Sequence, residues 1–184
     1  MKTTQNGFVL FVVMTFLVVM SVLGISMFGG FIKDQKMSGN LREKQRAIEA
    51  SETSVDAVQY WMQQPGNLFT GVWNTGIACS TTTQSGPIPV VCSNALANPA
   101  SLPWSSYNTF QAPNMTVSAT GGVNSYASMV NFHVQFLGPS GIGPSNTTAY
   151  YKVTSAAQGG NVAAAAVVET IFQITVNARD VGGS

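Results

Sequence analysis

The sequence has 184 residues, about the length of one ordinary domain. Hydrophobic residues make up 45% of it, but charged residues make up only 8%, against about 25% in a typical soluble domain. The formal net charge is +1, so no overall field attracts nucleic acid or acidic substrates. One histidine and two cysteines are too few for a histidine-based catalytic relay together with a metal site. We therefore expect no enzyme, no cofactor, no metal site and no direct contact with nucleic acid.

An uncharged apolar segment lies close to the N-terminus. Phe8 to Ile32 is 25 residues long, and as a helix it would measure roughly 37 Å, enough to cross a hydrocarbon core of about 30 Å. The apolar region of a secretory signal peptide is shorter, about 7–15 residues, and ends at an Ala-x-Ala-like site that is absent here. One small domain cannot cover every face of so apolar a helix. The segment is therefore predicted to be transmembrane.

The seven residues before this segment, MKTTQNG, are short and polar, carry Lys2, and end in Gly7 directly before Phe8. They resemble the leader of type IV prepilins, which prepilin peptidase, a membrane-embedded aspartyl peptidase, cuts on the cytoplasmic side after glycine. Glycine has no Cβ, so the extended backbone can approach the catalytic carboxylates. The resemblance implies cleavage between Gly7 and Phe8 and N-methylation of Phe8. The alternative is an uncleaved signal anchor.

A charged, amphipathic segment follows and holds ten of the charged residues, between Lys33 and Asp56. Its apolar residues recur at helical spacing, and a helix over residues 33–65 is predicted. Pro65 and Gly66 should end that helix, because proline disfavours helical geometry in the residue before it. A column of residues seven apart is expected to pack on the globular part: Leu41, Ile48, Val55 and Met62.

Two segments of the chain resemble one protein family. The run Met37 to Arg42 (MSGNLR), followed by Gln45, Ala47, Ala50, Glu52 and Ala57, is similar to the conserved N-terminal pattern of PilX-type minor pilins of type IV pili. Residues 151–155 (YKVTS), with Gly159–Gly160 and residues 167–170 (VVET), are similar to the ending of the same family. The resemblance covers residues 5–62 well and 150–172 loosely.

One position departs from most pilins. The resemblance implies a glutamate five residues past the cleavage point, which pairs with the terminal amine of a neighbouring subunit, but this position is Val12. An unpaired charge in lipid is costly, and PilX-type pilins and K-type pseudopilins are similar in lacking it. In those families the subunits are placed at the filament tip.

The remainder, residues 66–184, is rich in Ser, Thr, Asn, Gly and Pro. Residues 130–136 alternate apolar and polar without error, which predicts a half-buried strand. Residues 151–155, 168–176 and 115–119 are further predicted strands, with Val168, Thr170, Phe172, Ile174 and Val176 facing inward. We expect an α+β fold in which the long N-terminal helix, half transmembrane and half amphipathic, packs on an antiparallel sheet.

The expected organisation is a leader over residues 1–7, a transmembrane half-helix over 8–32, an amphipathic half-helix over 33–65 and an extracytoplasmic β-rich domain over 66–184. Cys79 and Cys92 are predicted to form a disulfide, because the membrane anchor and neutral surface indicate an oxidising compartment. The disulfide places the globular part outside the cytoplasm. His133 falls on the polar side of its strand and is expected to be a solvated or hydrogen-bonding surface residue.

The leading hypothesis is a minor pilin that primes or caps assembly of a type IV pilus, near the filament tip. The resemblance implies other minor and major pilins, prepilin peptidase and the inner-membrane assembly platform as partners. It also implies a single-pass location in a bacterial inner membrane before assembly, and in the pilus afterwards. Two alternatives remain open: a K-type pseudopilin of a type II secretion system, and a pilus-associated adhesin that binds through the aromatic residues of the segment 93–113, Trp104, Tyr107 and Phe110.

Overall fold

The computed structural model describes residues 6–80, 88–140 and 148–175 of the chain. The chain divides into two compact units, Met1–Arg42 and Glu43–Ser184. Helix α1 (Asn6–Gln63) contributes residues to both units. Every described residue of the first unit belongs to this helix.

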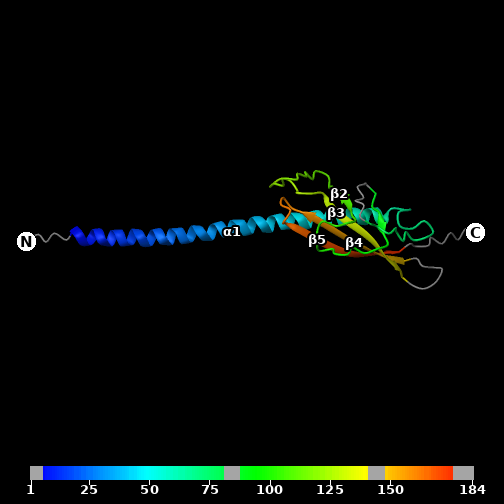
Figure 1. Ribbon diagram of the computed structural model, residues 1–184, viewed down its shortest axis with the longest axis horizontal. Coiled ribbons are helices and arrows are strands. Elements are labelled where there is room, and N and C mark those ends of the chain that lie inside the picture. The colour runs from blue at the N-terminus through cyan, green and yellow to red at the C-terminus, as the bar shows by residue number, and fades with distance from the viewer. Residues whose placement is uncertain (1–5, 81–87, 141–147, 176–184) are drawn as a thin grey trace, which may run out of the picture. The chain divides into compact units, whose positions relative to one another are not determined.

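The second unit contains one sheet (Figure 1). The strand order is β1-β3-β4-β5, and β2 also pairs with β3. β3, β4 and β5 pair antiparallel in chain order, as does β2 with β3, whereas the two-residue β1 runs parallel to β3. The expected α+β fold with a mainly antiparallel sheet is confirmed. The strands are β1 (Val91–Cys92), β2 (Asn108–Phe110), β3 (Val130–Pro139), β4 (Thr148–Gln158) and β5 (Ala165–Thr175).

The core of the second unit lies between the C-terminal part of α1 and one face of this sheet, as the cyan end of the helix beside the strands in Figure 1 shows. In the sheet register, Val134 is opposite Val153, and Tyr151 is opposite Phe172. These side chains share one face because directly opposed residues in an antiparallel pair point the same way. Val168, Phe172 and Ile174 pack against the core, as predicted, while Val176 lies outside the described residues.

The buried face of α1 follows the helical period and not the predicted seven-residue column. Met62 and Val55 are 2% and 7% exposed, but Ile48 is 36% exposed and Leu41 is 62% exposed. The expectation for Leu41 and Ile48 is corrected, since both are exposed. Positions seven apart drift by about 20° around a straight helix, so the column leaves the buried face towards its N-terminal end. The buried face consists of Ala47, Ala50, Ser51, Ser54, Val55, Val58 and Met62.

The ends of the elements mostly follow the predicted signals. α1 ends at Gln63, and Gly66 has a φ of 88°, the left-handed conformation that glycine adopts freely. The predicted strand over residues 115–119 does not form. That segment makes one isolated parallel bridge, Val117 with Tyr126, and buries Met115 in a second apolar cluster.

Candidate functional site

The apolar segment of α1 presents its side chains outward all round. Its large hydrophobic residues between Phe8 and Ile32 are between 46% and 74% exposed within the described structure. The hydroxyls of Thr15, Ser21 and Ser26 each donate to a carbonyl one turn back, as Ser21 Oγ does to Leu17 O at 2.7 Å. Polar groups satisfied within the helix are what a lipid-facing segment requires. By length and composition, α1 is able to cross a membrane.

The predicted processing residues lie at the beginning of this helix. α1 starts at Asn6 and includes Gly7 in its first turn, while residues 1–5 of the predicted leader lie outside the described residues. Phe8 is 74% exposed. Val12 is 46% exposed and places an aliphatic side chain where the resemblance implies a carboxylate in most pilins. Cleavage and N-methylation remain predictions.

In the second unit, Arg46 binds a loop that the sequence places far away. Its guanidinium donates to the carbonyls of Val123 at 2.9 Å and Ser125 at 3.1 Å, and it lies 4.6 Å from the centre of the Tyr126 ring. It also forms an ion pair with Glu43 at 3.0 Å. The rigid fork of donors on arginine suits this arrangement, because carbonyl oxygens, a carboxylate and a ring face are engaged together.

Glu43 in turn binds a second loop. Its Oε2 accepts a hydrogen bond from the backbone N–H of Gly160. The two glycines of this loop have no room for a side chain: an added Cβ would lie 2.4 Å from Glu43 O at Gly159, and 2.2 Å from Gly122 O at Gly160. Glu43 and Arg46 therefore hold two loops against α1, and we call this arrangement the Glu43–Arg46 clamp.

The clamp joins the two segments on which the family resemblance rests. Glu43 and Arg46 lie in the charged N-terminal segment, and Gly159–Gly160 lie in the downstream one. The sequence contained both halves, but their contact was not predicted. An Arg three residues after a Glu on a helix predicts only a local ion pair, whereas two adjacent glycines predict only a turn.

The predicted disulfide is confirmed. Cys79 and Cys92 are bonded, with 5.4 Å between their Cα atoms. Asn94 reinforces the link, because its Oδ1 accepts from Cys79 N at 2.7 Å and its Nδ2 donates to Cys79 O at 2.9 Å. The disulfide and this pair of hydrogen bonds tie the segment after β1 to the segment before it.

His133 was expected at the surface, but the structure buries its side chain. His133 is 1% exposed, and its Nε2 lies 3.0 Å from the carbonyl oxygen of Asn94. The side chain does point away from the helix, as the alternation predicts, but the segment after β1 covers that face of the sheet. Burial lowers the pKa of the imidazole below 6.5, while the nearby backbone of Asn94 and Ser106 partly offsets that lowering.

The aromatic residues of the segment 93–113 are anchors and not an exposed contact surface. Trp104 is 5% exposed, and its Nε1 donates to Pro99 O at 3.0 Å. Phe110 lies on β2 and packs against both apolar clusters. Tyr107 is partly buried. The adhesin alternative required these three rings to be exposed for contact with a ligand, and they are buried or partly buried.

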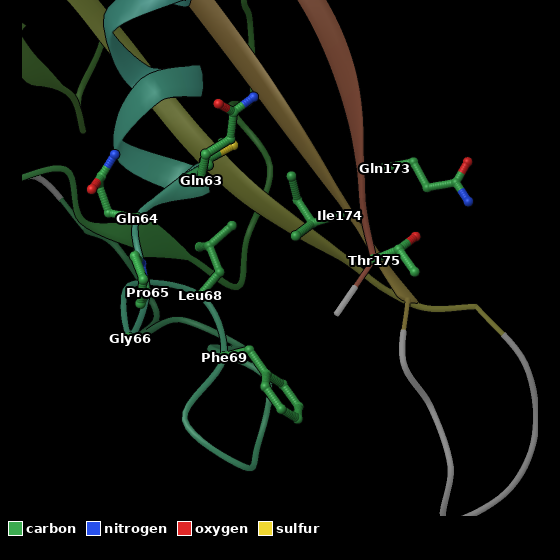
Figure 2. A pocket seen from close by; sticks show the side chains of 10 residues that line it. Gln63, Gln64, Pro65, Gly66, Leu68, Phe69, Gln173, Ile174 and Thr175 are labelled. Carbon is green, nitrogen blue, oxygen red and sulfur yellow. The ribbon is translucent and has the colours of Figure 1, made fainter. Parts of the chain in front are cut away.

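A groove of about 470 Å³ lies where α1 ends beside the end of β5 (Figure 2). Leu68 and Ile174 point into it, and Phe69 borders it, whereas Gln173 points away. None of the described residues that line it is charged. The described lining offers apolar contact with neutral hydrogen-bonding groups at the rim.

Among residues 6–80, 88–140 and 148–175, no group of three His, Cys, Asp or Glu side chains is placed to hold a metal ion. The geometry of these parts of the chain thus consists of an apolar helix, a clamp, a disulfide and a neutral groove.

Residues 6–56 match the family described as PilX N-terminal. The matched region contains the whole apolar segment and both residues of the clamp, Glu43 and Arg46. No curated protein and no solved structure matches the chain. The match covers 51 of the 184 residues and supports a likeness of the N-terminal part of the chain to PilX-type pilins of type IV pili. The family suggests a structural, non-enzymatic protein.

Proposed function

We propose that this protein is a minor pilin that primes or caps assembly of a type IV pilus near the filament tip. The observation that carries the proposal is the match of residues 6–56 to the PilX N-terminal family. That region combines an apolar helix with a charged helical segment that joins a compact domain. The protein acts as a structural subunit and has no catalytic residues of its own.

The apolar segment serves two successive environments. Before assembly, residues 8–32 hold the precursor in the inner membrane, with Lys2 on the cytoplasmic side and the globular domain outside. After cleavage between Gly7 and Phe8 by prepilin peptidase, and N-methylation of Phe8, the segment leaves lipid and is buried among the helices of other pilins. Its apolar surface stays out of water in both states.

Val12 supports the position near the tip. A carboxylate at this position would pair with the terminal amine of a neighbouring subunit, whereas an aliphatic side chain makes no such bond. A subunit without the carboxylate fits the end of a filament, where one neighbour is missing. Substituting Val12→Glu should therefore place the protein along the shaft as well as at the tip, as measured by immunogold labelling of sheared filaments.

The test of the whole proposal is the intact mass and N-terminal sequence of the protein from native membranes, with and without prepilin peptidase. We expect a mature chain starting at methylated Phe8 in the strain with the peptidase, and a chain starting at Met1 in the strain without it. A Gly7→Glu variant should also start at Met1 in the strain with the peptidase, whereas Asn6→Ala, its matched control, should still be processed. A chain that starts at Met1 in both strains would identify an ordinary signal-anchored protein.

The role in assembly needs a separate readout. Deleting the gene should greatly reduce the number of surface filaments, and the complementing wild-type gene should restore it. Normal filament numbers in the deletion strain, with loss of attachment to surfaces alone, would instead favour an adhesin.

A further inference from the structure

Strand β5 forms one long edge of the sheet. In the described parts of the chain it pairs with β4 alone. The strands on the opposite side of the sheet are short, because β1 and β2, which both pair with β3, have two and three residues. All eleven residues of β5 are in uninterrupted register with β4. The sheet therefore presents one extended, regular edge along β5 (Figure 1).

The backbone of β5 alternates between two directions. The turn before it is closed by a hydrogen bond from Gly159 N to Ala164 O at 2.9 Å. Hydrogen-bonded and non-hydrogen-bonded pairs alternate along an antiparallel ladder, so the even-numbered residues of β5 bond to β4, whereas the odd-numbered ones direct N–H and C=O to the edge. Within the described parts of the chain, no other segment forms a backbone hydrogen bond with these odd-numbered residues. They are Val167, Glu169, Ile171, Gln173 and Thr175.

The edge lacks the features that usually prevent a sheet from pairing with another chain. Proteins protect such edges with proline, lysine or a bulge, and β5 contains none of the three. Its one charged residue, Glu169, is engaged by β4, through Lys152 at 3.6 Å and Thr154 Oγ1 at 2.9 Å. Ile171, two residues further on, is 60% exposed. A second strand would therefore meet an open row of backbone donors and acceptors.

The neutral groove lies beside the same edge, on the helix side of β5. Ile174 and Leu68 point into this groove of about 470 Å³, whereas Gln173 points away from it (Figure 2). Side chains alternate between the two faces along every strand of a sheet. A strand added to β5 would therefore direct every second side chain to the helix side, where the groove lies. Edge and groove together fit one kind of occupant, an extended strand with apolar side chains at alternate positions.

We propose that the free edge of β5 is a docking site for an extended strand of another protein. The strand pairs with the backbone of residues 167–175 and places one of its alternate apolar side chains in the groove. The main-chain hydrogen bonds supply affinity, and the groove selects the side chain. A neutral or basic residue suits the position beside Glu169, because like charges opposed across two strands are destabilising. The site depends on the second unit alone and does not require the proposed role near the filament tip.

The direction of α1 disfavours a second copy of this chain as the occupant. α1 and β5 run in the same direction, since Ser51 Oγ donates to Ala166 O, and Met62 lines the groove together with Ile174. Antiparallel pairing of two β5 strands would therefore point residues 43–63 of the two copies in opposite directions. Copies anchored in one membrane share one direction, so the edge suits a strand from a different protein.

The first test measures amide hydrogen exchange by NMR on the full chain in detergent micelles. The amides of Glu169, Ile171 and Gln173 should exchange more than about ten-fold faster than those of Thr170 and Phe172, which bond to β4. Equal protection of all five amides in the isolated protein would overturn the proposal, because the edge would already be paired.

The second test identifies the occupant by photo-cross-linking in cells, with benzoylphenylalanine in place of Gln173. Mass spectrometry of the product should locate the contact in a segment of another protein that has apolar residues at alternate positions. Ile88, which is 66% exposed and lies outside β5, is the control position and should not give this product. The proposal is overturned if position 173 gives no cross-link, if it reacts only with a second copy, or if both positions give the same product.

Variants of Ile171 separate the backbone from the side chain. Ile171→Pro removes an N–H that faces the edge and leaves the bonds to β4, so the cross-link from position 173 should fall by about ten-fold or more. Ile171→Thr keeps both the N–H and a β-branched side chain, and it should retain the cross-link. Equal cross-linking in the two variants would contradict strand pairing. Thermal unfolding of each purified chain reports whether the sheet is intact. If proline unfolds the sheet, Ile171→Lys replaces it, because lysine protects natural edges, and an unchanged cross-link in this variant would overturn the proposal.

Discussion

Glu43 and Gly160 are 117 residues apart in the sequence, yet the carboxylate of Glu43 accepts a hydrogen bond from the backbone N–H of Gly160. The contact links the helix to the turn between β4 and β5. Arg46, paired with the same carboxylate, links the helix to the loop that ends at Tyr126. Two residues of one helical turn thereby fix two separate loops, and each can be tested.

Replacing Gly160 with alanine should destabilise the second unit. The added Cβ would lie 2.2 Å from Gly122 O and 2.7 Å from Glu43 Oε2, and overpacking of this kind costs about 1–3 kcal/mol, occasionally more. Thermal unfolding of the full chain in micelles measures the loss. Gly39→Ala is the control: no atom lies within 4 Å of the added Cβ, and alanine favours the helix. An unchanged midpoint for Gly160→Ala would mean that the loop lies elsewhere in solution.

Arg46→Lys should weaken the clamp although it conserves the charge. Lysine cannot reach Glu43, Val123 O and Ser125 O with one planar group, so the expected loss is about 1–3 kcal/mol in the free energy of unfolding. Denaturant unfolding measures it. Arg42→Lys, at an exposed position without a resolved contact to the loops, should leave the stability within about 0.5 kcal/mol. Equal effects of the two substitutions would contradict the geometry of the clamp.

Removing the disulfide should lower stability by about 3 kcal/mol, because the bond closes a short loop in the unfolded chain. The double substitution Cys79→Ser with Cys92→Ser avoids a leftover thiol. Comparing its unfolding midpoint with that of the wild-type protein under reducing conditions separates the lost bond from any effect of serine. Asn94→Ala should add a smaller loss, about 1 kcal/mol, since the backbone N–H and C=O of Cys79 lose their partner.

Two buried serines should respond in opposite directions. Ser155 Oγ is buried without a hydrogen-bond partner among the described residues, so Ser155→Ala removes a polar cost and should be neutral or stabilising by up to about 1 kcal/mol. Ser51 Oγ donates to Ala166 O at 3.4 Å, and Ser51→Ala should cost a few tenths to about 1 kcal/mol. Paired thermal scans measure the difference, and a strong loss in Ser155→Ala would reveal a missing partner.

Alkaline pH should destabilise the second unit through Tyr151. Burial raises the pKa of Tyr151 to about 12, and its hydroxyl donates to Asn74 O at 3.1 Å. The pKa of a tyrosine in the unfolded chain is about 10. A tyrosine whose pKa is higher in the folded state stabilises the fold fully below the unfolded pKa. This stabilisation is lost as the pH rises from the unfolded pKa towards the folded one. The unfolding midpoint should therefore fall between pH 10 and 12. In Tyr151→Phe the fall over this range should be smaller; an identical profile would assign the effect to other groups.

The sequence predicted best where one physical rule governs a long stretch. An uncharged, mostly apolar segment of 25 residues is typical of a membrane-spanning helix, and strict alternation over residues 130–136 marks β3 because its two faces have different surroundings. The end of α1 followed from Pro65 and Gly66. These elements depend on local chemistry, which the sequence carries directly.

The incorrect and missed predictions share a different cause. Alternation places His133 on the face away from the helix, but it cannot show that residues 94–107 fold back and bury that face. The seven-residue column suggested Ile48 as a core residue, whereas Ala47 and Ala50 are the buried residues of this part of the helix. The clamp was missed because it depends on a contact between distant segments. Each of these features is set by tertiary packing.

The position of the clamp has a practical consequence for anyone who wishes to study the globular part without lipid. The second compact unit begins at Glu43, the first residue of the clamp. A soluble fragment that starts a few residues later, beyond Arg46, would remove the anchors of both loops and expose Gly159 and Gly160. A fragment that starts before Glu43 keeps the anchors while discarding the apolar segment. Whether a soluble fragment folds well is thus expected to depend on where it starts within a single helical turn, Glu43 to Arg46.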